Sequence, residues 1–130
     1  MAHILVVDDD AQVRLTLGEY MTKSGHDVTL ASNGADALQL VAARKVDLIL
    51  IDIIMPEQNG FETILMIAGL RGRPAIIAMS GGSRQLDLDF VHSIAKKLPI
   101  EDFLHKPVSF EVLGAAIDRA LAQRSDAPGI

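Results

Sequence analysis

Residues 46–60 read VDLILIDIIMPEQNG, and this stretch decides the fold. The apolar run at 48–51 does not alternate with polar residues, which is typical of a parallel strand buried on both faces. Asp52 is the first polar residue after that run. Open α/β sheets build their sites at the carboxyl ends of the strands. We therefore expect Asp52 to face a crevice, because Pro56 and Gly60 delay the start of the next helix.

The same succession of an apolar run and a polar end recurs along the chain. Strands are expected at about 4–7, 28–31, 48–51, 75–79 and 102–104, and helices at about 11–24, 61–70, 90–98 and 110–121, with a further helix after the Asn33-Gly34 turn. Strands that alternate with helices favour parallel pairing, right-handed crossovers and helices on both sheet faces. The predicted fold is α/β, with a doubly wound, five-stranded parallel sheet.

Composition limits the size of the domain and the kinds of partner. The chain has 130 residues, of which 49% are hydrophobic, so we expect one domain at 1–124 and a flexible tail at 125–130. Its 12 basic and 17 acidic residues argue against nucleic acid as a direct ligand.

The absence of cysteine excludes disulfides and thiolate chemistry. No apolar run is long enough to span a membrane, so a cytoplasmic location is expected.

Four of the predicted strands end in residues suited to phosphoryl transfer. Asp8 and Asp9 follow the first strand, Asp52 the third, Ser80 the fourth and Lys106 the fifth. Carboxylates brought to one edge repel unless a cation neutralises them, and Mg²⁺ suits a site of carboxylates, waters and a phosphate. A lysine and a hydroxyl can receive phosphoryl oxygens while Asp52 attacks phosphorus. The peptide bond that follows Lys106 precedes a proline, and we expect it to be cis.

Each of these features alone has a simpler explanation. Asp8 and Asp9 belong to an acidic triplet that, taken alone, is more commonly a helix cap with solvated charges. Ser80 precedes two glycines and is compatible with an ordinary turn, and Phe103 is compatible with a core position. The combination with Asp52 favours the functional interpretation.

The order and spacing of these motifs resemble a known family. The chain has Val-Val-Asp-Asp at residues 6–9, Asp52 followed by Met55-Pro56 and Gly60, Ser80, and Lys106-Pro107. Over residues 4–121 it resembles the CheY-like receiver domains of two-component response regulators. The resemblance implies a flavodoxin-like (βα)5 fold with strand order 2-1-3-4-5.

The resemblance also implies a reaction at Asp52. Asp52 would accept a phosphoryl group from a phosphohistidine on a sensor histidine kinase or a histidine phosphotransfer protein. Mg²⁺ would be bound by Asp52, by Asp9 directly, by Asp8 through water and by the backbone carbonyl of Ile54. Such a domain is not an enzyme in the usual sense, since it catalyses only its own phosphorylation and dephosphorylation.

The output of the domain is likewise implied by the resemblance. Lys106 would contact the phosphoryl group, Ser80 would be the switch hydroxyl, and Phe103 would be the aromatic side chain that turns inward. Partners, or a second copy of the chain, would bind the face formed by the fourth helix, the fifth strand and the fifth helix. The chain is interpreted as a stand-alone receiver or as one taken from a larger regulator or hybrid kinase.

Two other functions are compatible with parts of this pattern. A Mg²⁺-dependent phosphohydrolase of the haloacid dehalogenase type also uses an aspartyl nucleophile, but it needs an acid two residues later, where this chain has Ile54. A scaffold receiver that is never phosphorylated would not need the complete set of acid, hydroxyl and lysine. In the family that the chain resembles, the lifetime of the phosphorylated state varies with the residue two beyond the acceptor and with those after the switch hydroxyl. These are Ile54, Gly81 and Gly82 here, and none has a side chain that positions an attacking water, so the resemblance implies a long-lived phosphorylated state.

Overall fold

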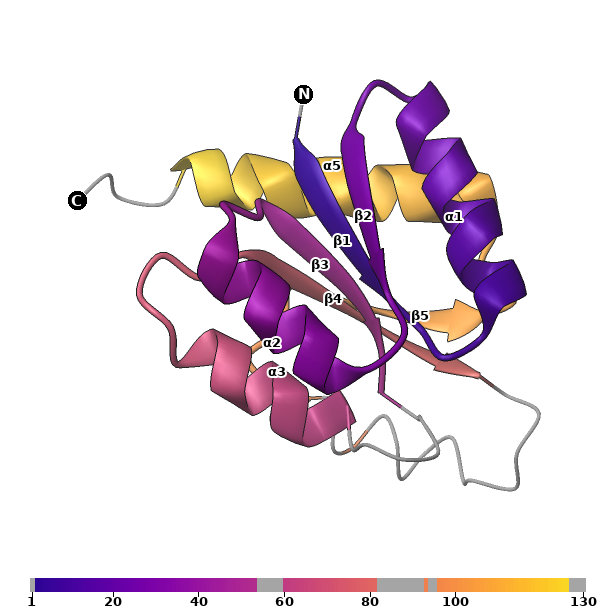
Figure 1. Ribbon diagram of the computed structural model, residues 1–130. Coiled ribbons are helices and arrows are strands. Elements are labelled where there is room, and N and C mark those ends of the chain that lie inside the picture. Colours follow the sequence, from indigo (N-terminus) through magenta and orange to yellow (C-terminus); the bar gives the residue numbers. More distant parts are fainter. Residues whose placement is uncertain (1, 54–59, 82–92, 94–95, 127–130) are drawn as a thin grey trace.

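The structure, a computed structural model, describes residues 2–53, 60–81, 93 and 96–126. Five parallel strands form one sheet in the order β2-β1-β3-β4-β5 (Figure 1). Their bounds are His3–Val7 for β1, Asp27–Ala31 for β2, Leu48–Asp52 for β3, Ala75–Gly81 for β4 and Asp102–Lys106 for β5. The predicted fold class and strand order are confirmed, and β3 lies at the centre of the sheet.

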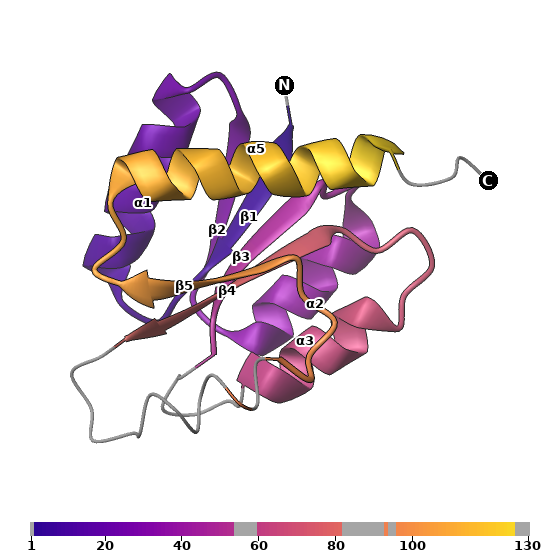
Figure 2. The same ribbon diagram turned by 180° about the vertical axis from the view of Figure 1, so that it is seen from behind.

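Helices cover both faces of the sheet. They are α1 (Ala11–Lys23), α2 (Gly34–Ala43), α3 (Gly60–Ala68) and α5 (Phe110–Asp126). Helices α1 and α5 lie on one face, and α2 and α3 lie on the other (Figures 1 and 2). The helix predicted at 90–98 falls largely outside the described residues. Helix α5 continues to Asp126, so the first two residues of the expected tail at 125–130 are helical.

The sheet separates two apolar clusters, because side chains of successive strand residues point to opposite faces. In β3, Leu48 and Leu50 pack with the cluster beneath α1 and α5, whereas Ile49 and Ile51 pack with the cluster beneath α2 and α3. All five residues of β3 are buried. The unbroken apolar run at 48–51 is therefore explained by the burial of β3 between helices on both faces of the sheet.

Local capping sets where two helices begin. The Asp10 carboxylate accepts hydrogen bonds from the backbone N–H groups of Gln12 at 2.9 Å and Val13 at 3.4 Å, so Asp10 is the N-cap of α1. The side chain of Asn33 accepts a 2.8 Å bond from the Asp36 N–H at the start of α2. Only three residues therefore separate β1 from α1, and two separate β2 from α2.

Three strands extend beyond their apolar runs. Asp52, Ser80 and Lys106 are strand residues, and the β4–β5 pairing aligns Ser80 with His105 and Gly81 with Lys106. Parallel pairing continues past the last apolar residue because the backbone groups still find partners in the neighbouring strand. Asp52, Ser80 and Lys106 consequently lie within the sheet, whereas Asp8 and Asp9 follow the end of β1.

Candidate functional site

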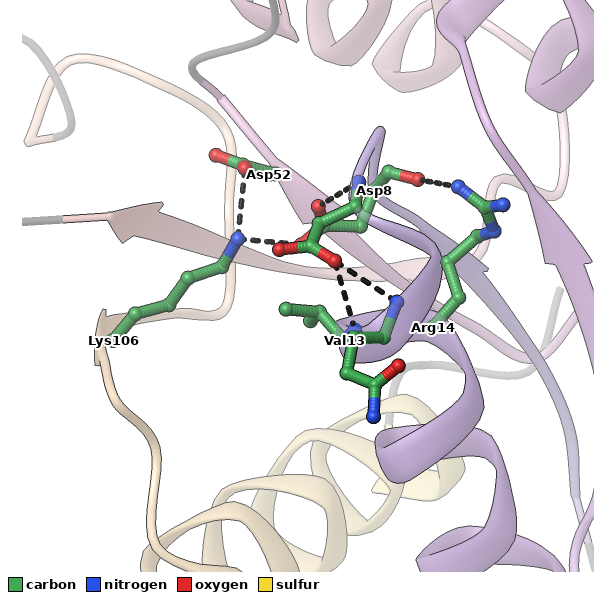
Figure 3. Close-up of polar contacts among 7 residues, drawn as sticks. Asp8, Val13, Arg14, Asp52 and Lys106 are labelled. Carbon is green, nitrogen blue, oxygen red and sulfur yellow. Dashed lines mark hydrogen bonds and ion pairs between the residues drawn. The ribbon is translucent and has the colours of Figure 1, made fainter.

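A lysine bridges two buried carboxylates at the carboxyl edge of the sheet. Lys106 Nζ donates to Asp8 Oδ2 at 2.5 Å and to Asp52 Oδ2 at 2.8 Å (Figure 3). Asp8 is fully buried and Asp52 is 4% exposed. The three residues follow or end β1, β3 and β5, so parallel strands bring together residues separated by up to 98 positions. The predicted convergence of Asp8, Asp52 and Lys106 is therefore observed.

The two carboxylates set the ionisation of the lysine. Burial of Lys106 lowers its pKa, but hydrogen bonds to Asp52 and Asp8, together with the negative charge of both, outweigh burial and raise the pKa above the ordinary 10.5. Lys106 is consequently an ammonium at neutral pH. It neutralises one of the two buried negative charges.

Two contacts on the α1 side orient Asp8. Its Oδ1 atom accepts a 2.9 Å hydrogen bond from the backbone N–H of Asp10, and its carbonyl oxygen accepts a 2.6 Å bond from Arg14 Nη1 (Figure 3). Arg14 was not predicted as part of the site. Its place in the first turn of α1 could have indicated the contact, because helical side chains tilt toward the helix N-terminus.

Asp9 completes an acidic cluster that fits a metal ion. Oxygen atoms of Asp8, Asp9 and Asp52 lie within 4.8 Å of one another, and Asp9 is exposed. Carboxylate oxygens at this spacing suit Mg²⁺, which keeps several waters and takes only a few protein ligands. The backbone carbonyl of Ile54, the fourth expected ligand, lies outside the described residues.

The proposed switch residues lie near the site without joining it. Ser80 is 1% exposed and follows the residue of β4 that pairs with Asp52. Among the described residues, its hydroxyl is not hydrogen-bonded to Asp52 or Lys106. Phe103 is half-buried against the cluster beneath α2 and α3, and its ring meets His105 edge-on at 5.2 Å.

The chain leaves β5 through a cis peptide bond. The Lys106-Pro107 bond is cis, which confirms the expectation.

No helix in the described residues has the length and apolar character needed to cross a membrane.

The structure is thus a doubly wound parallel sheet whose carboxyl edge holds three carboxylates and a lysine. The family model for the response regulator receiver domain matches residues 4–118. The chain therefore belongs to the response regulator receiver domain family of two-component systems. Domains of this family are generally signalling domains and not enzymes, so the phosphohydrolase alternative is not favoured.

Relatives of known name support this membership. Protein PilH of Pseudomonas aeruginosa is 34% identical over 122 residues, which are 94% of this chain and 99% of that protein. The DNA-binding transcriptional regulator NtrC of Rhizobium meliloti is 34% identical over 128 residues, 98% of this chain and 25% of that protein. The chain therefore spans about a quarter of the length of NtrC.

Solved structures agree with the fold. A response regulator receiver domain protein from Clostridium thermocellum superposes with a TM-score of 0.83 at 25% identity, covering 96% of this chain and 98% of that one. A sensor protein from Polaromonas sp. JS666 gives a TM-score of 0.81 at 26% identity, with 94% and 97% covered.

Proposed function

We propose that Asp52 is the phosphoacceptor of this receiver domain. The observation that carries the proposal is the Lys106 ammonium, held between the buried carboxylates of Asp52 and Asp8 at 2.8 and 2.5 Å. Family membership supplies the class of reaction, and Asp52 stands at the carboxyl end of the central strand, the edge at which open α/β sheets build their sites.

The phosphoryl donor is a phosphohistidine on a sensor histidine kinase or a histidine phosphotransfer protein. A carboxylate oxygen of Asp52 attacks phosphorus, and the phosphorus–nitrogen bond breaks with its electron pair returning to the imidazole. The product is an aspartyl phosphate, which water hydrolyses to restore Asp52. The domain thus catalyses only its own phosphorylation and dephosphorylation.

Magnesium is the cofactor that we propose for this step. Asp9 and Asp52 would hold it directly, Asp8 through water, and Ile54 through its backbone carbonyl. When bound, Mg²⁺ supplies positive charge against the oxygens of the transferring group. The three carboxylates fit this role because their oxygens lie within 4.8 Å of one another.

Lys106 and Ser80 would bind the phosphoryl oxygens. An ammonium has three donors, and two of those on Lys106 already point at Asp8 and Asp52. Ser80 would turn its hydroxyl toward the new group, and Phe103 would move inward to occupy the space that is released. The added negative charge then shifts the population between two conformations.

The readout would be a protein contact in the cytoplasm. The proposed docking face combines the segment at 90–98 with β5 and α5, and a second copy of the chain is one candidate partner for it. Direct contacts with nucleic acid or membrane are not proposed, because the net charge is −5.

Intact-mass measurement tests the assignment. The protein is incubated with Mg²⁺ and a small phosphodonor such as acetyl phosphate, and we expect wild type to gain one phosphoryl group and Asp52→Asn to gain none. Asp27→Asn is the matched control, since Asp27 is an exposed carboxylate at the start of β2 and should leave the gain unchanged. Equal labelling of wild type and Asp52→Asn would overturn the proposal.

A second variant separates phosphorylation from its output. Lys106→Ala should still be labelled at Asp52, while the change in partner binding or self-association on phosphorylation is lost. Size-exclusion chromatography before and after labelling measures the change. If Lys106→Ala switches as wild type does, Lys106 has no part in the output.

A further inference from the structure

The end of the sheet opposite Asp52 contains a second candidate site. A cavity of about 220 Å³ lies between the α2–β3 and α3–β4 connections. Strands β3 and β4 are parallel neighbours with Leu48 beside Ala75, so both connections enter the sheet at the same end. Figures 1 and 2 show these connections at the end of the sheet away from the strand arrowheads. Asp52 lies four positions after Leu48, about 13 Å along an extended strand.

Four of the nine residues that line this cavity are basic. Its lining residues include Arg44, Lys45, Arg71 and Arg73. Arg73 is neutralised by a 3.0 Å ion pair with Glu101 Oε1. In the described part of the chain, no ion pair involves the other three cations.

The nearest acidic residue in sequence does not balance these charges by an ion pair. Asp47 follows the cavity-lining Val46, but its Oδ2 atom accepts a 2.8 Å hydrogen bond from the backbone N–H of His3 on the β1 side. Helices α2 and α3 both end near the cavity, and each carbonyl end carries about half a negative charge. The partial charges of these two helix ends together offset roughly one of the three positive charges that have no ion pair among the described residues. An excess of positive charge therefore remains in a chain whose net charge is −5.

Apolar side chains form the rest of the wall. Val41, Val46, Leu70 and Pro74 line the cavity beside the basic residues, and Leu70 is 42% exposed. A cationic rim next to an exposed apolar surface matches a ligand with anionic and apolar parts. Guanidinium groups suit phosphate because they bind its oxygens with two parallel N–H bonds.

We propose that this cavity binds an organic phosphate. The phosphate groups would contact Arg44, Lys45 and Arg71, and the apolar part would rest on Val41 and Leu70. The cavity volume accommodates a phosphate-sized group, and the rest of the ligand extends toward solvent. The site is separate from the Asp52 edge and does not depend on phosphorylation.

Nuclear magnetic resonance titration tests the proposal. Asp52→Asn protein in EDTA is titrated with sodium pyrophosphate and, separately, with ADP. We expect saturable shifts of the backbone amides at 44–46 and 70–73. Equal affinities would show that the site binds the phosphate groups alone, and tighter binding of ADP would show that the apolar wall contributes. Absence of saturable binding, or shifts centred on 52–53 and 106, would overturn the proposal.

Paired variants test the residues. Arg71→Ala and Lys45→Ala should each raise the Kd for pyrophosphate roughly tenfold, because each removes a charge-assisted contact. Arg119→Ala and Lys23→Ala remove the same charges from exposed positions on α5 and α1 and should change the Kd less than about twofold. If all four variants weaken pyrophosphate binding equally, binding depends only on the net charge of the protein, and the assignment to this cavity is overturned.

Discussion

Replacing Lys106 with methionine should destabilise the metal-free protein strongly. Methionine keeps much of the apolar stem but removes the ammonium that bridges Asp8 and Asp52, whose side chains are 0% and 5% exposed. Breaking a buried ion pair by removing one partner typically costs about 3–5 kcal/mol, because the remaining charge is left buried. The Lys106 side chain is 18% exposed, which favours the lower end, about 3 kcal/mol.

This free energy corresponds to a measurable change in melting temperature. An unfolding entropy of about 2.1 cal/mol/K per residue gives roughly 0.27 kcal/mol/K for the 130-residue chain. A loss of about 3 kcal/mol therefore lowers the Tm by about 11 °C. Thermal unfolding in EDTA, followed by circular dichroism, measures this difference.

Two comparisons isolate the cause. Lys23→Met removes an exposed lysine paired with Glu19 at 2.9 Å and should cost less than about 1 kcal/mol. Adding Asp52→Asn to Lys106→Met removes one unpaired buried charge and should recover part of the lost stability. A Lys106→Met protein that melts within about 2 °C of wild type in EDTA would refute the reasoning.

Three further predictions concern pH, packing and lifetime. The folded state raises the pKa of Lys106, so the Lys106 ammonium contributes its full stabilisation below pH 10.5, the unfolded-state pKa. This contribution is lost as pH rises through the folded-state pKa. The difference in Tm between wild type and Lys106→Met should therefore shrink when melts are recorded above the folded-state pKa. Gly60→Ala should lower the free energy of unfolding in denaturant by about 1–3 kcal/mol and slow the phosphorylation of Asp52, because the added Cβ would lie 2.7 Å from the Asp52 carbonyl oxygen. Gly69→Ala is the control: its Cβ would lie 3.6 Å from the nearest atom, so neither effect is expected. The aspartyl phosphate should outlast that of a receiver with polar residues at the positions of Ile54 and Gly81, and fast loss of phosphoryl mass in purified protein would contradict this expectation.

The strands and their functional ends were predictable from sequence because each depends on local pattern. The apolar run before Asp52 has one physical explanation, burial on both faces, and parallel topology then brings the carboxyl ends together. Asp8 and Lys106 could therefore be assigned to one site without knowledge of side-chain positions. The same reasoning placed the end of β4 too early, because pairing of Ser80 and Gly81 with β5 depends on a neighbour remote in sequence.

The contacts within the site were less predictable. The assignment of Lys106 to a phosphoryl group stays a prediction, and sequence reasoning did not specify that its side chain bridges Asp8 and Asp52. Arg14 was not predicted because its partner is a backbone carbonyl, and the only sequence signal for the contact is its place in the first turn of α1. Such contacts depend on side-chain conformations that tertiary packing selects, and pattern alone does not specify them.

Charge balance accounts for the composition of the site. Three carboxylates and one ammonium leave two negative charges unneutralised, which is the charge that a divalent cation supplies. Replacing the Asp52 carboxylate by an acyl phosphate adds roughly one more negative charge. Lys106 is the basic side chain that contacts both Asp8 and Asp52 among the described residues, and its third N–H donor remains for a phosphoryl oxygen. A lysine suits this position better than an arginine because a compact ammonium can bond to three groups in different directions, whereas a planar guanidinium directs its donors within one plane.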